Sequence, residues 1–163
     1  SRIADSVNHD GPTIKKKKIT EAHVGKGTQV GPYAYLRPGS NIGAGCRIGD
    51  FVEVKNSNID DGAKVSHLTY VGDGDVGKNV NVGCGVVFVN YDGKEKARTT
   101  VGDDAFIGCN TNLISPVSVG KGAYIAAGAT VTKDIPDDAL CIARAREIIK
   151  DGWGRGRYQV KKK

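Results

Sequence analysis

A chain of 163 residues with a net charge of +6 is long enough to form one domain with its own hydrophobic core. Only 6% of the residues are aromatic and 23 are glycine, which excludes a core of large aromatic side chains and favours small and β-branched ones. No apolar stretch has membrane-spanning length and no signal-peptide pattern opens the sequence, so we expect a soluble, cytoplasmic protein without a membrane partner.

The N-terminal residues 1–23 hold weak six-residue units such as "IADSVN", and the absence of methionine leads us to expect that Ser1 is a cut or processed end. Two lysine clusters, residues 15–18 and 161–163, carry much of the positive charge. They lack the aromatic platforms and motifs of nucleic-acid-binding modules, so we interpret them as solvated surface and tail, with no nucleic-acid partner.

From Val24 to Val131 the chain follows a period of six residues. An aliphatic side chain, replaced once by Phe88, opens each unit, and fourteen intervals measure six residues. The fifth residue is small and the second is often Gly or Asp, as in "VGKGTQ" and "VGKGAY". The opening residues are Val24, Val30, Leu36, Ile42, Ile48, Val54, Ile59, Val65, Val71, Val76, Val82, Phe88, Val101, Ile107, Leu113, Val119, Ile125 and Val131.

A period of six fits neither a helix, whose apolar residues recur every three or four positions, nor a simple alternating strand. It fits a solenoid in which each hexapeptide forms a short strand and a turn, and three hexapeptides close an eighteen-residue coil. The first and fifth residues would fill a narrow core, and glycine would serve the tight corners. We therefore predict an all-β parallel β-helix over residues 1–135, with the coil already running before residue 23.

Departures from the period mark the places where a site is expected. Two units lose a residue, ending at Asn58 and Asp75, and the interval from Phe88 to Val101 is thirteen residues long. Its segment "NYDGKEKARTT" predicts a loop near 90–100 that protrudes from the coil around an Asp-Gly turn. Since a regular solenoid offers no pocket of its own, we expect the functional site at these irregularities.

Beyond Val131 the repeat is expected to give way to a cap or arm with a basic tail, residues 136–163. Pro136 could open a short helical segment from Ala143 to Lys150, which would cover the end of the solenoid. The glycines that follow would leave the remainder irregular.

The cysteines show no pattern of a disulfide framework or a metal site. They are 38, 25 and 32 residues apart and form no CxxC pair, so we expect reduced structural thiols and no metal ion. The four are Cys46, Cys84, Cys109 and Cys141.

His67 is the candidate catalytic residue. It is the third residue of the unit "VSHLTY", an outward or corner position, and Tyr70 and a shortened unit follow. Transfer of an acyl group to an amine requires a base near neutral pKa, which histidine supplies. The other two histidines, His9 and His23, lie outside this part of the repeat.

Seven segments occur in order: "RPGS", "GDFVEVKNS", "SHLTYVGD", "VGKNVNVGCG", "NYDGK", "VGKGAYIAAG" and "IARAR". Together they resemble the acetyltransferase half of the bifunctional bacterial enzymes that make UDP-N-acetylglucosamine, within the hexapeptide-repeat acyltransferase family. The resemblance runs from about residue 1 to Trp153. It implies a left-handed β-helix and a homotrimer with sites between neighbouring subunits. The implied reaction transfers acetyl from acetyl-CoA to the amino group of glucosamine 1-phosphate.

The resemblance also implies a role for each matching residue. His67 is then the general base. The implied contacts to the sugar phosphate and the sugar are Arg37, Lys55, Tyr70, Asn81 and Lys96. The implied contacts to acetyl-CoA are Cys84, Asn90, Tyr91, Cys109, Ala127 and Arg144. Basic side chains suit a phosphate, because guanidinium and ammonium groups donate charge-assisted hydrogen bonds.

The sequence departs from the family in two respects. Position 84 is commonly Ala and position 109 commonly Ser in the family, whereas both are Cys here. If these positions contact acetyl-CoA through backbone N–H groups, the change should matter little, but if the hydroxyl group at position 109 is required, binding of acetyl-CoA should weaken. The glycine-rich nucleotide loop and metal-binding carboxylates of a uridyltransferase half are absent. We therefore expect acetyl transfer alone from this chain, with no tightly bound cofactor.

Three alternatives remain from the sequence. A related acetyltransferase with another amine or hydroxyl acceptor would keep His67 but not the set of basic and sugar contacts. A carbonic anhydrase would need three converging imidazoles, for which the histidines are unsuitably spaced. A non-catalytic trimeric scaffold would need neither the displayed histidine nor the basic loop.

Overall fold

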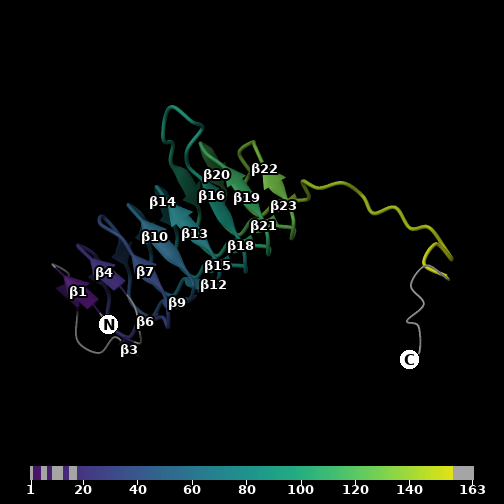
Figure 1. Cartoon of the computed structure of the whole chain (residues 1–163). Helices are drawn as coiled ribbons and strands as arrows, with labels where there is room; N and C mark the ends of the chain where they lie inside the picture. Colours follow the sequence, from purple (N-terminus) through teal and green to yellow (C-terminus); the bar gives the residue numbers. More distant parts are fainter. Residues whose placement is uncertain (1, 5–6, 9–12, 15–17, 156–163) are drawn as a thin grey trace, which may run out of the picture.

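The computed structural model describes residues 2–4, 7–8, 13–14 and 18–155, and its strands form a β-solenoid of three parallel sheets (Figure 1). We name the sheets A, B and C. Sheet A holds β1 (Arg2–Ala4), β4 (Lys18–Thr20), β7 (Tyr35–Leu36), β10 (Glu53–Lys55), β13 (Tyr70–Gly72), β16 (Val87–Val89), β19 (Asn112–Ile114) and β22 (Thr130–Val131). Sheet B holds β2 (Val7–Asn8), β5 (His23–Val24), β8 (Asn41–Ile42), β11 (Asn58–Ile59), β14 (Gly74–Val76), β17 (Thr99–Val101) and β20 (Val117–Val119). Sheet C holds β3 (Thr13–Ile14), β6 (Gln29–Val30), β9 (Arg47–Asp50), β12 (Lys64–His67), β15 (Asn81–Val82), β18 (Phe106–Ile107), β21 (Tyr124–Ile125) and β23 (Leu140–Cys141).

Each coil takes one strand from each sheet, and equivalent residues of successive coils pair in parallel register. Val54 pairs with Leu36, eighteen residues earlier, and with Val71, seventeen residues later, because a shortened unit lies between. The predicted β-helix with eighteen-residue coils is confirmed. Strands β1 to β4 also confirm that the coil is already running before residue 23.

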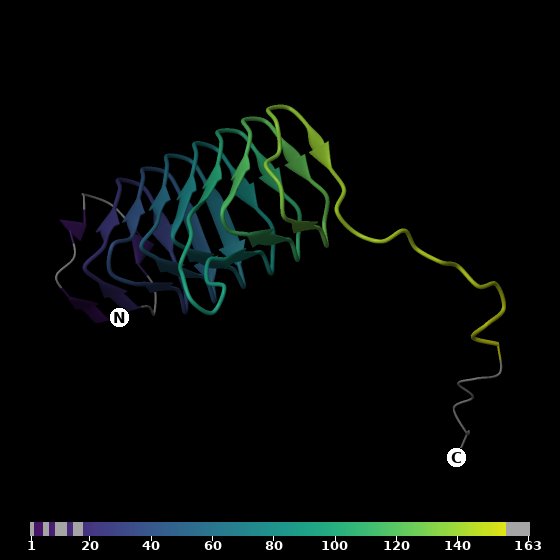
Figure 2. The same cartoon turned by 90° about the horizontal axis from the view of Figure 1, so that it is seen from above.

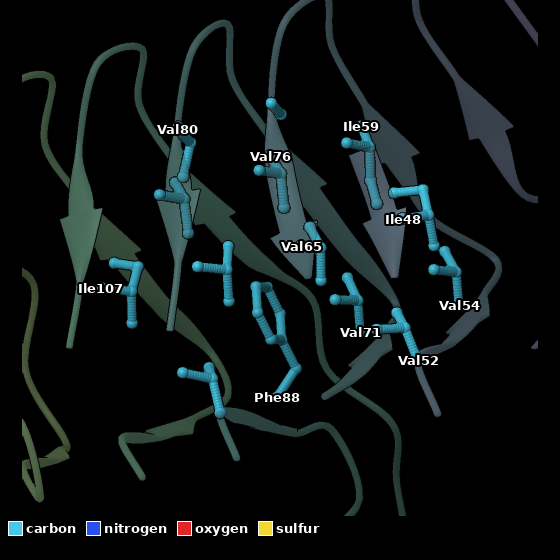
Figure 3. Close-up of a cluster of buried hydrophobic side chains, with 14 of the residues drawn as sticks. Ile48, Val52, Val54, Ile59, Val65, Val71, Val76, Val80, Phe88 and Ile107 are labelled. Atoms are coloured by element: carbon cyan, nitrogen blue, oxygen red, sulfur yellow. The ribbon is translucent and has the colours of Figure 1, made fainter. Parts of the chain in front are cut away.

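The core is the stack of residues that open the hexapeptides. Figure 3 shows Val65, Val71 and their neighbours pointing inward around Phe88, the one aromatic side chain of the core, which is 0% exposed. A Cβ atom on Gly74 would lie 2.9 Å from the Phe88 ring. The glycine of the shortened unit therefore makes room for the large side chain of the next coil.

All three irregularities of the repeat lie at the same corner of the solenoid, where the chain passes from sheet A to sheet B. In three successive coils this corner carries the two shortened units and then the protruding loop between β16 and β17 (Figure 1). Asn56 and Asp73 turn the shortened corners with φ of 47° and 50°, a left-handed conformation that Asn and Asp tolerate. The sequence shows that the period breaks, and the structure shows that the breaks are stacked.

The C-terminal end differs from one expectation. Strand pairing continues to Cys141, past the boundary predicted at residue 135, because "IPDDAL" is itself a hexapeptide that opens with Ile135 and has Ala139 in fifth position. The helix proposed for Ala143–Lys150 is wrong: residues 142–150 contain no helix, and beyond Ala143 and Arg144, which still lie against the last coil, the chain forms an extended arm that leads away from the coils (Figure 2). A segment this short has too few hydrogen bonds to form a helix without a surface to pack on.

No helix capable of crossing a membrane occurs in the described part of the chain. The lysines at 15–17, those at 161–163 and His9 lie outside the described residues.

Candidate functional site

Three of the predicted sugar-phosphate contacts share the outer face of sheet A. Tyr70 pairs with Glu53 of the previous coil, and Lys55 pairs with Gly72. Arg37 directly follows β7, one coil before Lys55. In-register pairing therefore places these cationic and phenolic side chains on adjacent coils, although they are up to 33 residues apart in sequence.

Arg37 is held by a carboxylate on the neighbouring coil. Its Nη1 atom donates a 2.8 Å hydrogen bond to Glu53 Oε1, and this bond raises the pKa of the guanidinium above its usual value. Because the guanidinium group is planar and rigid, this one hydrogen bond also fixes the directions of its other N–H groups.

Asp73 is a hub at the corner between sheets A and B. Lys55 Nζ donates to both of its carboxylate oxygens, at 3.3 and 3.5 Å, and the side-chain amides of Asn56 and Asn90 each donate to one oxygen. Burial would raise the pKa of Asp73, but the hydrogen bonds from Asn56, Asn90 and Lys55 together hold it below its usual value. Asp73 is therefore an ionised group that joins Lys55 to Asn90, the first residue of the protruding loop.

Tyr70 depends on the glycine two positions later. Its ring lies over Gly72, where a Cβ atom would collide with the ring and its hydroxyl group. Since Gly72 is the register partner of Lys55, its missing side chain lets the phenol approach the lysine on the face of sheet A.

The other end of the loop is held by an ion pair. The Nε and Nη2 atoms of Arg98 donate to the two oxygens of Asp75, each at 2.6 Å, and Nη1 and Nη2 donate to the carbonyl groups of Asn56 and Gly74. The hydrogen bond from Arg98 lowers the pKa of Asp75, and the same pairing raises that of Arg98. The five-residue unit "VGDGD" thus supplies both carboxylates that tie the loop to the coil.

Between these ties the loop forms a small hairpin. Tyr91 bridges to Lys96, and the Tyr91 hydroxyl group donates to the Gly93 carbonyl group at 2.7 Å. Asp92 accepts hydrogen bonds from two backbone N–H groups, which lowers its pKa. Lys96 is exposed on this hairpin, and the next residue, Ala97, donates its N–H group to the Asn90 carbonyl group at 3.0 Å. Asn90 in turn bonds to Asp73, the carboxylate partner of Lys55.

His67 belongs to a stack of residues along the corner between sheets C and A, which we call the corner column. Its members, one from each coil, are Asp50, His67, Cys84, Cys109 and Ala127. Backbone hydrogen bonds of 2.8 to 3.4 Å connect each of the first four members to the next coil. The N–H groups of Leu68, Gly85, Asn110 and Gly128 donate to the carbonyl groups of Asp50, His67, Cys84 and Cys109, respectively. The catalytic candidate and three predicted acetyl-CoA contacts therefore form one line parallel to the solenoid axis.

The imidazole of His67 is exposed and joined by no hydrogen bond to another described side chain. It lines a groove of about 240 Å³ with Arg47, Asp50 and Ser66 of sheet C. An imidazole in this position can accept a proton from a bound amine without first leaving an internal partner.

The last two predicted contacts lie near this column in different ways. Arg144 continues the line past Ala127, because its Cδ atom lies 3.6 Å from where a Cβ atom of Gly128 would be. Asn81 begins β15 and pairs with Lys64 and Phe106, so it lies on the face of sheet C, one coil beyond His67.

The structure thus gathers the predicted residues into two groups: a basic face on sheet A with the loop, and the corner column. Sequence reasoning missed four residues that hold the first group: Glu53, Asp73, Asp75 and Arg98. The two aspartates could have been suspected, because both stand in the shortened unit "VGDGD", where the sequence already predicts a departure from the regular coil. Glu53 and Arg98 gave no such signal, since their partners are 16 and 23 residues away in sequence.

The histidines do not form a zinc site among the described residues. His23 begins β5 in sheet B, whereas His67 ends β12 in sheet C. No cluster of three metal-ligating side chains occurs in the described part of the chain.

Comparisons with known proteins agree with this architecture. The bacterial transferase hexapeptide model, built from six repeats, matches residues 21–56 and 98–133. "Bifunctional protein GlmU" of Clostridium botulinum (strain Kyoto / Type A2) is 58% identical over 153 residues, which cover 94% of this chain and 34% of that protein. "Bifunctional protein GlmU" of Clostridioides difficile (strain 630) is 59% identical over 153 residues, which cover 94% of this chain and 33% of that protein.

The chain is a hexapeptide-repeat protein homologous to the C-terminal part of GlmU. It spans about a third of the length of these GlmU relatives. Among solved structures, PerB from Caulobacter crescentus in complex with CoA and GDP-perosamine superposes with a TM-score of 0.62 at 25% identity, over 69% of this chain and 52% of that one. The similarity to GlmU confirms the family that the ordered motifs suggested.

Proposed function

We propose that this chain transfers an acetyl group from acetyl-CoA to the amino group of glucosamine 1-phosphate, giving N-acetylglucosamine 1-phosphate for UDP-N-acetylglucosamine synthesis. The observation that carries the proposal is the corner column, which leads from His67 to Arg144 beside a basic face with a tied loop. The homology to GlmU supports both substrates, and the CoA complex of PerB supports CoA as the cosubstrate.

In the proposed reaction His67 acts as the general base. The amine nitrogen attacks the thioester carbonyl carbon, and the imidazole takes the proton that the nitrogen loses. The C–S bond then breaks, and the sulfur leaves with the bonding electrons and is protonated to give the CoA thiol. His67 suits this role because its imidazole is exposed and has no hydrogen-bonded partner among the described side chains.

The basic face would hold the sugar phosphate. Arg37 and Lys55 already have carboxylate partners, so their charges are balanced before substrate binds. Lys96 adds a cation from the loop, and a phosphate placed among the three would receive charge-assisted hydrogen bonds. The paired carboxylates of Glu53 and Asp73 keep the two cations in place between turnovers.

The corner column would hold acetyl-CoA. The thioester would lie near His67, and the rest of the molecule would run past Cys84, Cys109 and Ala127 towards Arg144, whose guanidinium group suits a CoA phosphate. Asn90 and Tyr91 would contribute from the loop. Because neighbouring coils are about 4.8 Å apart, His67 and Ala127 are separated by roughly 14 Å along the axis, which suits an extended ligand.

We propose a homotrimer with the reaction site between neighbouring subunits. The groove at His67 is lined from one side by sheet C of a single chain, and a neighbouring copy would supply its other wall. The exposed Ile148 and Ile149 on the C-terminal arm are suited to pack against such a copy. Light scattering tests this: a trimer is expected, and a stable, active monomer would contradict it.

The deciding experiment measures release of the CoA thiol from acetyl-CoA with glucosamine 1-phosphate, glucosamine, glucosamine 6-phosphate and a nucleotide-linked amino sugar. Glucosamine 1-phosphate should react fastest, because the basic face recognises its phosphate. A faster reaction with the nucleotide-linked sugar would favour a PerB-like acceptor instead. Equal or absent rates across all acceptors would exclude the assignment.

The role of His67 is tested by His67→Ala with His23→Ala as the matched control. Loss of a general base should lower kcat roughly 10²- to 10⁴-fold. His23 is an exposed histidine on sheet B, away from both groups of site residues, so its removal should leave kcat unchanged. Circular dichroism should show the same solenoid for both variants; a near-normal rate for His67→Ala would remove it from the mechanism.

A further inference from the structure

Cys84 and Cys109 are consecutive members of the corner column. The N–H group of Asn110 donates to the carbonyl group of Cys84 at 2.8 Å, and that of Gly128 donates to Cys109 at the same distance. These bonds, with the pairing of Val82 to Ile107, place the two cysteines in register on neighbouring coils although they are 25 residues apart in sequence.

Side chains at equivalent positions of neighbouring coils contact each other at several places on this solenoid. The rings of Phe106 and Tyr124 stack with centroids 4.6 Å apart, and Asn41 Nδ2 donates to Asn58 Oδ1 at 2.9 Å. Neighbouring strands are about 4.8 Å apart, which lies inside the Cα separation of roughly 4.4–6.8 Å that a disulfide spans. Cys84 and Cys109 therefore have the spacing for a covalent bridge.

The other two cysteines lack this arrangement. Cys46 is buried, and its Sγ atom contacts the carbonyl oxygen of Asp60 at 3.1 Å, while burial raises the pKa of its thiol. Cys141 ends β23 and pairs with Ile125, in a different column from Cys109. Cys84 is half-buried and Cys109 is exposed, so solvent reaches the pair.

We propose that Cys84 and Cys109 form an oxidation-sensitive dithiol site that closes reversibly to a disulfide. With a peroxide, one thiol attacks the peroxide oxygen and gives a sulfenic acid and water, and the second thiol displaces the sulfenic oxygen as a second water. The two sulfurs together lose two electrons and two protons, and the peroxide is reduced. With a low-molecular-weight disulfide, two exchange steps give the same bridge and release two small thiols.

The consequence for activity rests on the proposed function. The bridge would lie across the corner column one coil beyond His67, where acetyl-CoA is proposed to bind. Closing it would remove both thiol groups from the ligand track and fix their side chains in one geometry. Oxidation would then stop acetyl transfer until a reductant reopens the bridge.

The test treats the reduced protein with hydrogen peroxide or diamide and counts free thiols in denaturant with Ellman's reagent. Intact mass and peptide mapping follow. The wild type should lose two thiols per chain and two hydrogen atoms of mass, and one peptide should link Cys84 to Cys109. Cys141→Ser, the matched control, should also lose two thiols, whereas Cys84→Ala and Cys109→Ser should form no such bridge. Loss of only one thiol, or bridges only between chains, would overturn the proposal.

Activity is compared before and after oxidation within each variant, so that no assumption about basal rates is needed. Wild type and Cys141→Ser should lose activity on oxidation and regain it with dithiothreitol, whereas Cys84→Ala and Cys109→Ser should keep their own starting rate. A mapped bridge without loss of activity would uphold the dithiol site and overturn the proposed acetyl-CoA track. A missing bridge in an enzyme that still transfers acetyl to glucosamine 1-phosphate would overturn the dithiol site and leave the proposed function standing.

Discussion

The loop at 90–98 and the arm at 142–155 both leave the regular coils, yet they are attached in opposite ways. The loop returns to the solenoid and is tied at its start by Asn90 to Asp73 and at its end by Arg98 to Asp75. The arm leaves after the bond between the Thr130 N–H group and the Ala143 carbonyl group and extends away from the coils (Figure 1). Its Ile148 and Ile149 are 85% and 80% exposed.

The difference indicates what each segment needs to become part of a site. The loop's contacts come from its own chain, and they are charged hydrogen bonds that leave the hairpin in a fixed position. The arm carries apolar side chains, Ile148 and Ile149, that the described part of its own chain does not cover, so its ordering depends on a neighbouring surface. Contacts from the loop should therefore survive dilution of the protein, whereas contacts from the arm should depend on the proposed assembly.

Substitution of Asp73 should give the largest effect on the loop. Asp73→Asn keeps the shape of the side chain but replaces one of its two acceptor oxygens with an NH₂ group. Three donors, on Lys55, Asn56 and Asn90, then face a single acceptor, and Lys55 loses its carboxylate partner. We expect a loss of about 2–3 kcal/mol in the free energy of unfolding, since both side chains of the ion pair are largely buried. The Michaelis constants for both substrates should rise, because Lys55 and Asn90 are displaced together.

Urea unfolding and steady-state kinetics measure these effects. Asp61→Asn is the matched control, because Asp61 accepts a hydrogen bond from the Ala44 N–H group and an asparagine oxygen can accept the same bond. A rise in the Michaelis constant for only one substrate would show that Asp73 does not couple the two binding groups.

Removal of the apolar contacts of the arm should give the next largest effect. Ile148→Ser with Ile149→Ser should leave unfolding of the dilute chain unchanged but weaken assembly by about 2–3 kcal/mol, which corresponds to burial of one or two aliphatic side chains. Sedimentation over a range of concentrations measures this. Lys150→Ala serves as the control, and an unchanged association constant for the double variant would show that these residues do not face another copy.

The same contrast explains what could be predicted from the sequence. The period of six fixes which residues face the core, because Val54, Val71 and their equivalents must recur once per unit, and this alone predicts the solenoid. It also shows that the shortened units and the loop are exceptions. With three units per coil it also implies that these exceptions recur at one corner, because each is three units from the next. It does not show that Arg98 reaches back to Asp75, because no pattern in the sequence pairs side chains 23 residues apart.

The prediction of a helix in the arm is wrong for a physical reason. Pro136 is typical of a helix start when it is taken with the residues that follow, but Ile135 and Ala139 continue the solenoid pattern. The coil prevails because it packs the partly buried Ile135 against the previous turn. Among the described residues, the segment beyond has no surface on which a helix could pack. Site residues such as Lys55 were found by resemblance, whereas their partner Asp73 was found only from the structure.

Loosening of the loop's far end should have a smaller effect than loss of Asp73. Arg98→Lys keeps the charge but loses the two-pronged bond to Asp75 and the bonds to two carbonyl groups. Because both partners are more than a third exposed, we expect a cost of about 1 kcal/mol or less. Hydrogen exchange should accelerate at the Ala97 amide, which bonds to the Asn90 carbonyl group. Arg146→Lys on the arm should change neither quantity, and equal effects of the two variants would contradict the distinction between the tied loop and the extended arm.

The smallest effect concerns pH. The hydrogen bond from Arg98 holds the pKa of Asp75 below its usual 3.8, so the pair stabilises the fold at neutral pH and loses this contribution as the pH falls through the lowered folded-state value. Asp75→Asn removes the charge at every pH. The difference in unfolding free energy between wild type and Asp75→Asn should therefore be largest at neutral pH, below about 1 kcal/mol for this exposed pair, and should shrink in acid. Asp151→Asn on the arm should show no such dependence. A wild-type advantage that persists or grows in acid would mean that the carboxylate of Asp75 is not what ties the loop.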